Sequence, residues 1–187
     1  MTVPLWRTRS SRTIYQNPWL RLREDLVELP SGRTTVYGVV STGSCVGVLP
    51  FLDPDTVVLV RQYRYVAGRH TWEMPTGGVG PDEPIDHAAQ RELAEESGYR
   101  AGRLEPVCVY HTSKSVMDET AHLFLASDMT RAEHAPEPDE TESFQVRPHR
   151  FQEVLDMVDT GEIVDSMTII AVLQAERRRA DRRPPPP

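Results

Sequence analysis

The chain lacks a hydrophobic run long enough to cross a membrane. None of its apolar stretches approaches the roughly 18 residues that a spanning helix requires. Its first residues, MTVPLWRTRSSRT, also lack the apolar centre of a signal peptide. We therefore expect a cytoplasmic protein with no membrane partner.

Cysteine is scarce as well. The two cysteines, Cys45 and Cys108, both stand inside apolar runs. Buried thiols in a reducing compartment explain such residues better than a disulfide or a metal site does.

Positive charge is in deficit. The sequence has 21 Lys and Arg against 28 Asp and Glu, which gives a formal net charge of −7. A protein that binds nucleic acid mainly through its net charge has a positive net charge. We therefore expect a small-molecule partner and no nucleic acid.

The pattern of the 187 residues predicts one α/β domain preceded by an antiparallel β meander. Strands of a mixed sheet are expected in residues 44–52, 56–66, 104–110, 120–127 and 142–148. Helices are expected in residues 84–97, 151–161 and 166–180. We divide the chain into the meander (1–40), the main domain (41–178) and a disordered basic, proline-rich tail (179–187).

Three glutamates crowd one helix face. With about 100° per residue, Glu92 and Glu96 lie about 40° apart and Glu95 lies about 60° to the other side of Glu92. Like charges at such spacing cost roughly 0.2 to 0.5 kcal/mol per pair. Either the face is a solvated surface or the carboxylates bind a hard cation such as Mg²⁺ or Mn²⁺. A glycine-rich loop, residues 77–80, leads into this helix and favours the second reading, because it can bring backbone close to a ligand.

The loop and helix together read GGVGPDEPIDHAAQRELAEESGY, residues 77–99. This stretch resembles the box of the Nudix hydrolases, which is written G, five residues, E, seven residues, R-E-U-x-E-E-x-G-U, with U a bulky aliphatic. Every fixed position matches except the last, where Tyr99 replaces the aliphatic residue. The resemblance implies the Nudix α/β/α sandwich with a mixed central sheet. It also implies hydrolysis of a nucleoside diphosphate linked to another moiety.

The resemblance assigns roles within the box. It implies that Glu92 and Glu96 are the main metal ligands and that Glu95 is a further ligand or assists one through water. Glu83 and Arg91 are expected to hold the loop and the helix together. Gly77 and Gly98 stand at the motif's fixed glycine positions and are expected to be structural.

Outside the box, residues 14–175 are similar to the ADP-ribose pyrophosphatases and related nucleoside diphosphate sugar hydrolases. That likeness implies that Arg64 holds phosphate, that Glu73 lies beside the site and that the carbonyl of Thr76 reaches a metal. Arg61 is a weaker substrate-binding candidate. The alternative is that both arginines are ordinary surface charges of a strand.

The likeness also places a general base on a mobile loop where Glu140 and Glu142 stand. A base must come within hydrogen-bond reach of the attacking water, and loops often close to supply it. We favour Glu142 because it is nearer the following strand, and we keep Glu140 as the second candidate. An acidic, solvated loop is the alternative for both.

Trp19 and Tyr37 match positions at which the subfamily stacks aromatic rings on the base, partly across a homodimer with exchanged N-terminal segments. Packing in the core is the alternative for both rings.

One departure from the subfamily concerns Lys114, which replaces the proline of the subfamily's Ser-Pro-Gly loop. The substitution leaves substrates other than ADP-ribose open, and Lys114 could itself contact phosphate or be a plain loop residue.

The expected reaction is metal-assisted hydrolysis that yields a nucleoside monophosphate and a sugar phosphate, with Mg²⁺ or Mn²⁺ as cofactor. A housecleaning nucleoside triphosphate pyrophosphohydrolase shares the box and is the alternative enzyme. A nucleotide-binding module without activity is the third reading.

Overall fold

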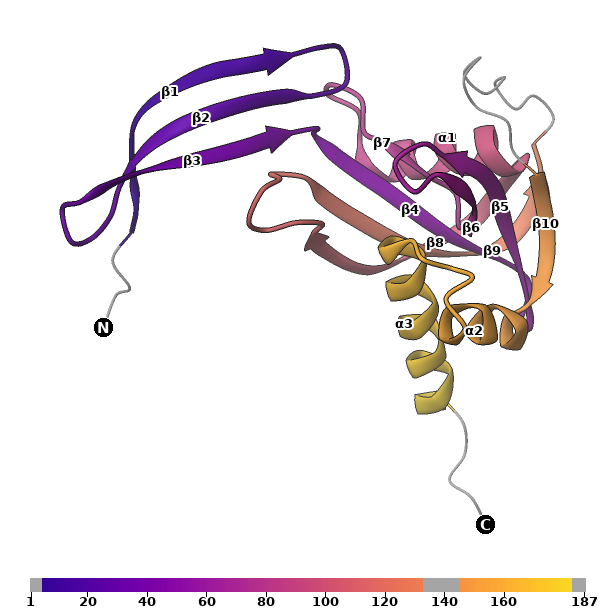
Figure 1. The fold of residues 1–187 in the computed structure, drawn as a ribbon. Coiled ribbons are helices and arrows are strands. Elements are labelled where there is room, and N and C mark those ends of the chain that lie inside the picture. Colours follow the sequence, from indigo (N-terminus) through magenta and orange to yellow (C-terminus); the bar gives the residue numbers. More distant parts are fainter. Residues whose placement is uncertain (1–4, 133–144, 183–187) are drawn as a thin grey trace. The chain divides into compact units, whose positions relative to one another are not determined.

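A computed structural model describes residues 5–132 and 145–182. The described residues form two compact units (Figure 1). The N-terminal unit contains the described residues up to Ser44 together with the segment from His111 to Thr120. The main unit contains the segment from Cys45 to Tyr110 and the described residues from Ala121 onward.

The N-terminal unit is built on a three-stranded antiparallel sheet of β1 (Arg7–Gln16), β2 (Arg21–Glu28) and β3 (Thr34–Ser41). Asn17 makes the first turn, because its side-chain oxygen accepts bonds from the amides of Trp19 and Leu20 at 2.9 and 2.8 Å. The expected meander is confirmed. However, β1 begins in a polar part of the sequence that has no alternation of apolar and polar residues. All residues of β1 are exposed, so no apolar pattern marks its start.

A loop from later in the chain completes this unit. The backbone of Val40 in β3 pairs with this loop, accepting from the amide of Asp118 at 3.1 Å and donating to the carbonyl of Val116 at 2.8 Å. The carboxylate of Asp118 accepts bonds from Arg23 at 3.1 Å and from Ser41 at 2.7 Å. Backbone pairing and charge together make the loop part of the N-terminal unit.

The main unit contains a seven-stranded sheet in the order β10-β5-β4-β9-β8, with β6 paired to β5 and β7 paired to β4. Its strands are β4 (Ser44–Asp53), β5 (Thr56–Arg64), β6 (Arg69–Glu73), β7 (Thr76–Gly78), β8 (Tyr99–His111), β9 (Thr120–Arg131) and β10 (Gln145–Arg150). Its helices are α1 (Ile85–Ser97), α2 (Phe151–Asp159) and α3 (Ser166–Arg182).

Successive residues of β4 face two different cores. Val46 and Val48 pack with Ala89 and Leu93 of α1 in a smaller core. Leu49 belongs to a larger core, formed with residues of α2, of α3 and of the segment between them, which include Phe151, Val154, Ile163 and Val172. Helices therefore cover both faces of the sheet, and the expected α/β/α sandwich with a mixed central sheet is confirmed.

The C-terminal helix is longer than expected. The tail was placed from residue 179, yet α3 continues to Arg182. Arg178 donates to Glu105 at 2.6 Å, and Arg179 donates to Asp55 and lies over the ring of Phe151, 4.5 Å from its centroid. These contacts attach the basic run to the sheet, so it continues the helix. Among the described residues, no helix is both long and apolar enough for a membrane span.

Leu93 anchors α1 and has no solvent exposure. Leu93→Ala should lower the free energy of unfolding by about 2 to 5 kcal/mol, because it removes buried contacts and leaves a cavity. Leu173→Ala is the control, since Leu173 is 50% exposed and its loss should change stability by about 0.5 kcal/mol or less. Urea unfolding measures both, and equal losses would contradict this placement of Leu93.

Candidate active site

The two structural glycines of the motif have different physical roles. A Cβ on Gly77 would lie 2.0 Å from the carboxyl carbon of Glu92, so only glycine lets the loop approach that side chain. Gly98 has φ of 71° and its amide donates to the carbonyl of Ala94 at 3.0 Å, which ends α1. The first glycine makes space for a carboxylate and the second stops the helix.

Arg91 joins the loop to the acidic helix. Its guanidinium donates to both oxygens of Glu83 at 2.9 Å, to Glu92 at 2.6 Å and to Glu95 at 3.1 Å. It also donates to the carbonyl of Gly78 at 2.9 Å. Five donors in a fixed fork suit this arrangement, which a lysine could not reproduce. Part of the repulsion among the glutamates is thus offset within the protein itself.

These bonds shift the pKa values of both partners. Bonds from Arg91, and then the amide of Gly80, lower the pKa of Glu83 to about 2. The pKa of Arg91 is raised, chiefly by its bonds to Glu83, against a smaller opposing effect of burial. Glu83 therefore stays ionised at any physiological pH and serves as an anchor.

Glu92 and Glu96 are nearly buried, with 9% and 4% exposure, and Glu95 is half-buried. A carboxylate oxygen of Glu96 accepts the amide of Thr76 at 2.9 Å. Within residues 5–132 and 145–182, no three His, Cys, Asp or Glu side chains are arranged to hold a metal on their own. Mg²⁺ is commonly held by one or two carboxylates together with substrate phosphates. The all-oxygen donor set and the glycine cradle against Glu92 fit such an ion.

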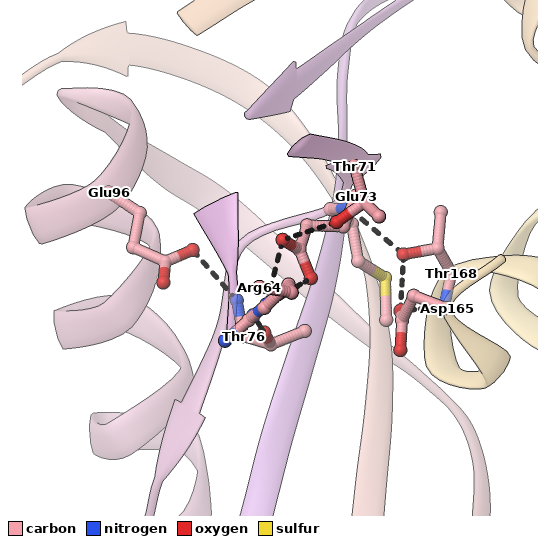
Figure 2. A network of polar contacts seen from close by, with 8 residues as sticks. Arg64, Thr71, Glu73, Thr76, Glu96, Asp165 and Thr168 are labelled. Carbon is pink, nitrogen blue, oxygen red and sulfur yellow. Dashed lines mark hydrogen bonds and ion pairs between the residues drawn. The ribbon is translucent and has the colours of Figure 1, made fainter. Parts of the chain in front are cut away.

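Near the acidic ridge of α1, which carries Glu92, Glu95 and Glu96, Arg64 and Glu73 form a bidentate ion pair (Figure 2). The Nε and Nη2 atoms of Arg64 lie 3.0 and 2.8 Å from the two oxygens of Glu73. Burial raises the pKa of Glu73, and the bonds from Arg64 oppose that shift. Arg64 Nη2 also lies 3.5 Å from the hydroxyl of Thr76, whose amide meets Glu96. The structure therefore brings Arg64, Glu73, Thr76 and Glu96 together.

Arg61 does not join this group. Its guanidinium lies 5.9 Å from the ring centroid of Trp72, which belongs to the larger core on the other face of the sheet. Successive residues of a strand point to opposite faces of the sheet. Arg61 and Arg64 are three positions apart in β5, so their side chains leave opposite faces. The structure thus speaks against Arg61 as a partner of Arg64.

Three further candidates belong to the N-terminal unit. Trp19 is 79% exposed, so packing in the core does not explain it. Tyr37 is half-buried, and its hydroxyl donates to the carbonyl of Ser115 at 2.8 Å. Lys114 is exposed. The two candidate bases, Glu140 and Glu142, lie outside the described residues.

Sequence reasoning missed three polar residues of this region. Thr71 approaches Glu73 at 3.4 Å, and Thr168 joins Asp165 at 2.6 Å and the amide of Met74 at 3.0 Å. A signal for Asp165 was present, because an aspartate directly before a helix is a typical N-cap. Nothing in the local sequence indicated that this helix start would reach Met74.

Two family profiles match the chain. Residues 6–40 match the nucleoside diphosphate sugar hydrolase N-terminal domain, and residues 42–167 match the NUDIX domain. The second match covers more than half of the chain and includes the whole glycine loop and acidic helix. The chain belongs to the Nudix family.

Individual relatives agree with this assignment. The chain is 30% identical to an ADP-ribose pyrophosphatase of Bacillus subtilis (strain 168), over 93% of this chain and 94% of the relative. It is 33% identical to a GDP-mannose pyrophosphatase of Escherichia coli O1:K1 / APEC, over 62% and 63%. A crystal structure of an ADP compounds hydrolase has the same fold, with a TM-score of 0.86, 19% identity and 97% coverage of both chains.

Replacing Arg91 with methionine should return the pKa of Glu83 from about 2 toward its ordinary value of 4.5. A lowered carboxyl pKa stabilises the fold above pH 4.5, and that contribution disappears as the pH falls to about 2. The stability difference between wild type and Arg91→Met should therefore be largest above pH 4.5 and should narrow below it.

Carboxyl NMR titration and unfolding at several pH values measure these effects. Arg100→Met, which removes an exposed arginine just beyond the same helix, is the control. An unchanged Glu83 titration in Arg91→Met would refute the role given to this pair.

Proposed function

We propose that this Nudix chain is a pyrophosphohydrolase that cleaves the diphosphate of a nucleoside diphosphate sugar. The observation that carries the proposal is the convergence of Glu96 of α1, the Thr76 amide and the Arg64–Glu73 pair within one polar network (Figure 2). Carboxylates can hold a cation, and a guanidinium can bind phosphate. Together they match the charge and chemistry of a pyrophosphate group that binds with a cation. The profile match of residues 6–40 and the names of the relatives support a nucleotide sugar as substrate.

The reaction requires a divalent metal ion, which we infer to be Mg²⁺, with Mn²⁺ as a substitute. Glu92 and Glu96 would hold it, with Glu95 and the carbonyl of Thr76 as further ligands. Such an ion neutralises phosphate charge and makes a bound water more acidic. The fully oxygen donor set and the low exposure of Glu92 and Glu96 support this assignment.

The chain's own residues then position the substrate. Arg64 binds a phosphate oxygen, and Glu73 keeps the guanidinium in place through its bidentate bonds. Glu142, or Glu140, accepts a proton from the attacking water. The water oxygen bonds to one phosphorus while the bond from that phosphorus to the bridging oxygen breaks. The products are a nucleoside monophosphate and a sugar phosphate.

ADP-ribose is the substrate we place first, because relatives that match nine-tenths of the chain are named for it. Other nucleoside diphosphate sugars stay open, because Lys114 replaces the expected loop proline. Trp19 and Tyr37 are the proposed stacking residues for the base, and the 79% exposure of Trp19 supports this for its ring. Lys114 is the proposed further phosphate contact.

We also propose a cytoplasmic homodimer in which the N-terminal segments, residues 1–40, are exchanged. The N-terminal unit exposes large apolar side chains, which include Trp6 just before β1 (54%), Tyr15 in β1 (55%) and Val36 in β3 (60%). Exposed apolar side chains and an exposed edge strand such as β1 favour a surface that a second chain covers. The main domain, residues 41–178, carries the chemistry.

The test of function is hydrolysis of ADP-ribose, GDP-mannose, UDP-glucose and dGTP with Mg²⁺. We expect monophosphate products from one or more of the sugars, whereas release of pyrophosphate from dGTP would favour a triphosphate pyrophosphohydrolase. Glu96→Gln should lower kcat by roughly 100-fold or more, because the metal loses a charged ligand. The amide oxygen can still accept the bond from Thr76, so the fold should remain.

Glu162→Gln is the matched control, because Glu162 is an exposed glutamate after α2. Circular dichroism checks the fold of both variants. Near-normal turnover by Glu96→Gln would remove Glu96 from the metal site, and inactivity of the wild type with all four substrates would refute the proposed function.

Sedimentation tests the dimer. The wild type should sediment at twice the chain mass of 21.2 kDa, and Val36→Glu should shift it toward that single mass by placing a charge in the interface. Val164→Glu, at a 43% exposed position of the main unit, should leave the dimer intact. A wild type that sediments as a monomer at micromolar concentration would refute the exchange.

A further inference from the structure

Between β6 and β7, within the candidate site, the chain stops pairing with one strand and starts pairing with another. β6 ends at Glu73 and pairs with β5, whereas β7 begins at Thr76 and pairs with β4. Met74 and Pro75 lie between the two strands and outside both ladders. Pro75 has no amide hydrogen. The amide of Met74, at a residue with no exposure, therefore needs a partner from elsewhere in the fold.

Three different elements hold this crossing. The amide of Met74 donates to the hydroxyl oxygen of Thr168 in α3 at 3.0 Å. The carbonyl of Pro75 accepts the amide of Val48 in β4 at 3.0 Å, and the amide of Thr76 donates to Glu96 in α1 at 2.9 Å. Figure 2 shows Glu96 and Thr168 approaching this stretch from opposite sides.

Thr168 is fixed as an acceptor. It is fully buried, and its hydroxyl donates to Asp165 at 2.6 Å. The same carboxylate oxygen accepts the amide of Thr168 at 2.8 Å, as a helix N-cap does. A hydroxyl has one proton, so donation to Asp165 leaves its lone pairs for the amide of Met74. Asp165 thus sets the direction in which Thr168 accepts.

The neighbours of Met74 carry the contacts of the site. Glu73, one residue before it, holds Arg64 in the bidentate pair, and Thr76, two residues after it, bonds to Glu96. We propose that Thr168, oriented by Asp165, is a positioning residue that fixes residues 73–76 and through them the phosphate-binding Arg64 and the metal ligand Glu96. The catalytic consequence rests on the function proposed above, whereas the structural one does not.

The test variant is Thr168→Val, which keeps the shape and removes both hydroxyl bonds. Exchange of the amide hydrogens of Glu73, Met74 and Thr76 in the metal-free protein should become faster. In the Mg²⁺-dependent assay, kcat/KM should fall about 10-fold or more and half-saturation should need about 10-fold more Mg²⁺, as is typical when an outer partner of a metal ligand is lost. Thr168→Ser, which keeps the hydroxyl, should restore all three values.

Val172→Ala is the control for general destabilisation, because Val172 is buried one turn further along α3 in the larger core. Where its melting temperature falls as much as that of Thr168→Val, Val172→Ala should still leave kcat/KM and the Mg²⁺ requirement near the wild-type values. Equal effects of Val172→Ala and Thr168→Val would overturn the proposal.

The exchange measurement separates the two hypotheses. If the wild type hydrolyses no substrate, the proposed function fails, and faster exchange in Thr168→Val still supports the role of Thr168 in holding residues 73–76. If the wild type is active and Thr168→Val matches it in kcat/KM and Mg²⁺ requirement, the positioning role is refuted, whatever the exchange rates.

Discussion

The guanidinium of Arg91 is the contact on which the rest of the site depends. It bonds to Glu83 of the loop, to Glu92 and Glu95 of the helix and to the carbonyl of Gly78. Without a cation there, like charges would separate the helix from the loop that enters it. Because Arg91 pairs with Glu92 and Glu95, Glu92 can keep its low exposure on the same helix face as those neighbours. Part of the repulsion within the acidic helix face is thereby offset.

A second constraint comes from the crossing between β6 and β7. The chain leaves one strand partner for another at Met74 and Pro75, so regular sheet bonds cannot hold it. Bonds from α1, β4 and α3 replace them, and this places the acidic ridge beside the Arg64–Glu73 pair. The candidate site is therefore assembled by elements from both faces of the sheet, although Glu92, Glu95 and Glu96 come from one helix.

Several elements were predictable because their signals are local. The α1 helix follows from its apolar spacing and its terminal glycine, and β4 and β5 follow from their apolar runs. The start of β1 had no local signal within the expected meander, since its first half is polar and the strand is held by backbone pairing and by ion pairs such as Arg12 with Glu24. The end of α3 was misplaced, because a basic run indicates solvent until its partners, here Glu105 and Asp55, are known.

The sequence by itself determined the family, the α/β/α architecture and the carboxylates of the acidic helix, because the motif needs fixed residue types at fixed spacing along one helix. Only the tertiary structure decided that Arg64 pairs with Glu73 whereas Arg61 lies over the ring of Trp72. It alone also decided that Thr168 reaches Met74, 94 positions away along the chain. Which face a strand residue occupies, and which distant helix meets a break in the sheet, are set by packing between elements. Such contacts leave no local pattern in the sequence.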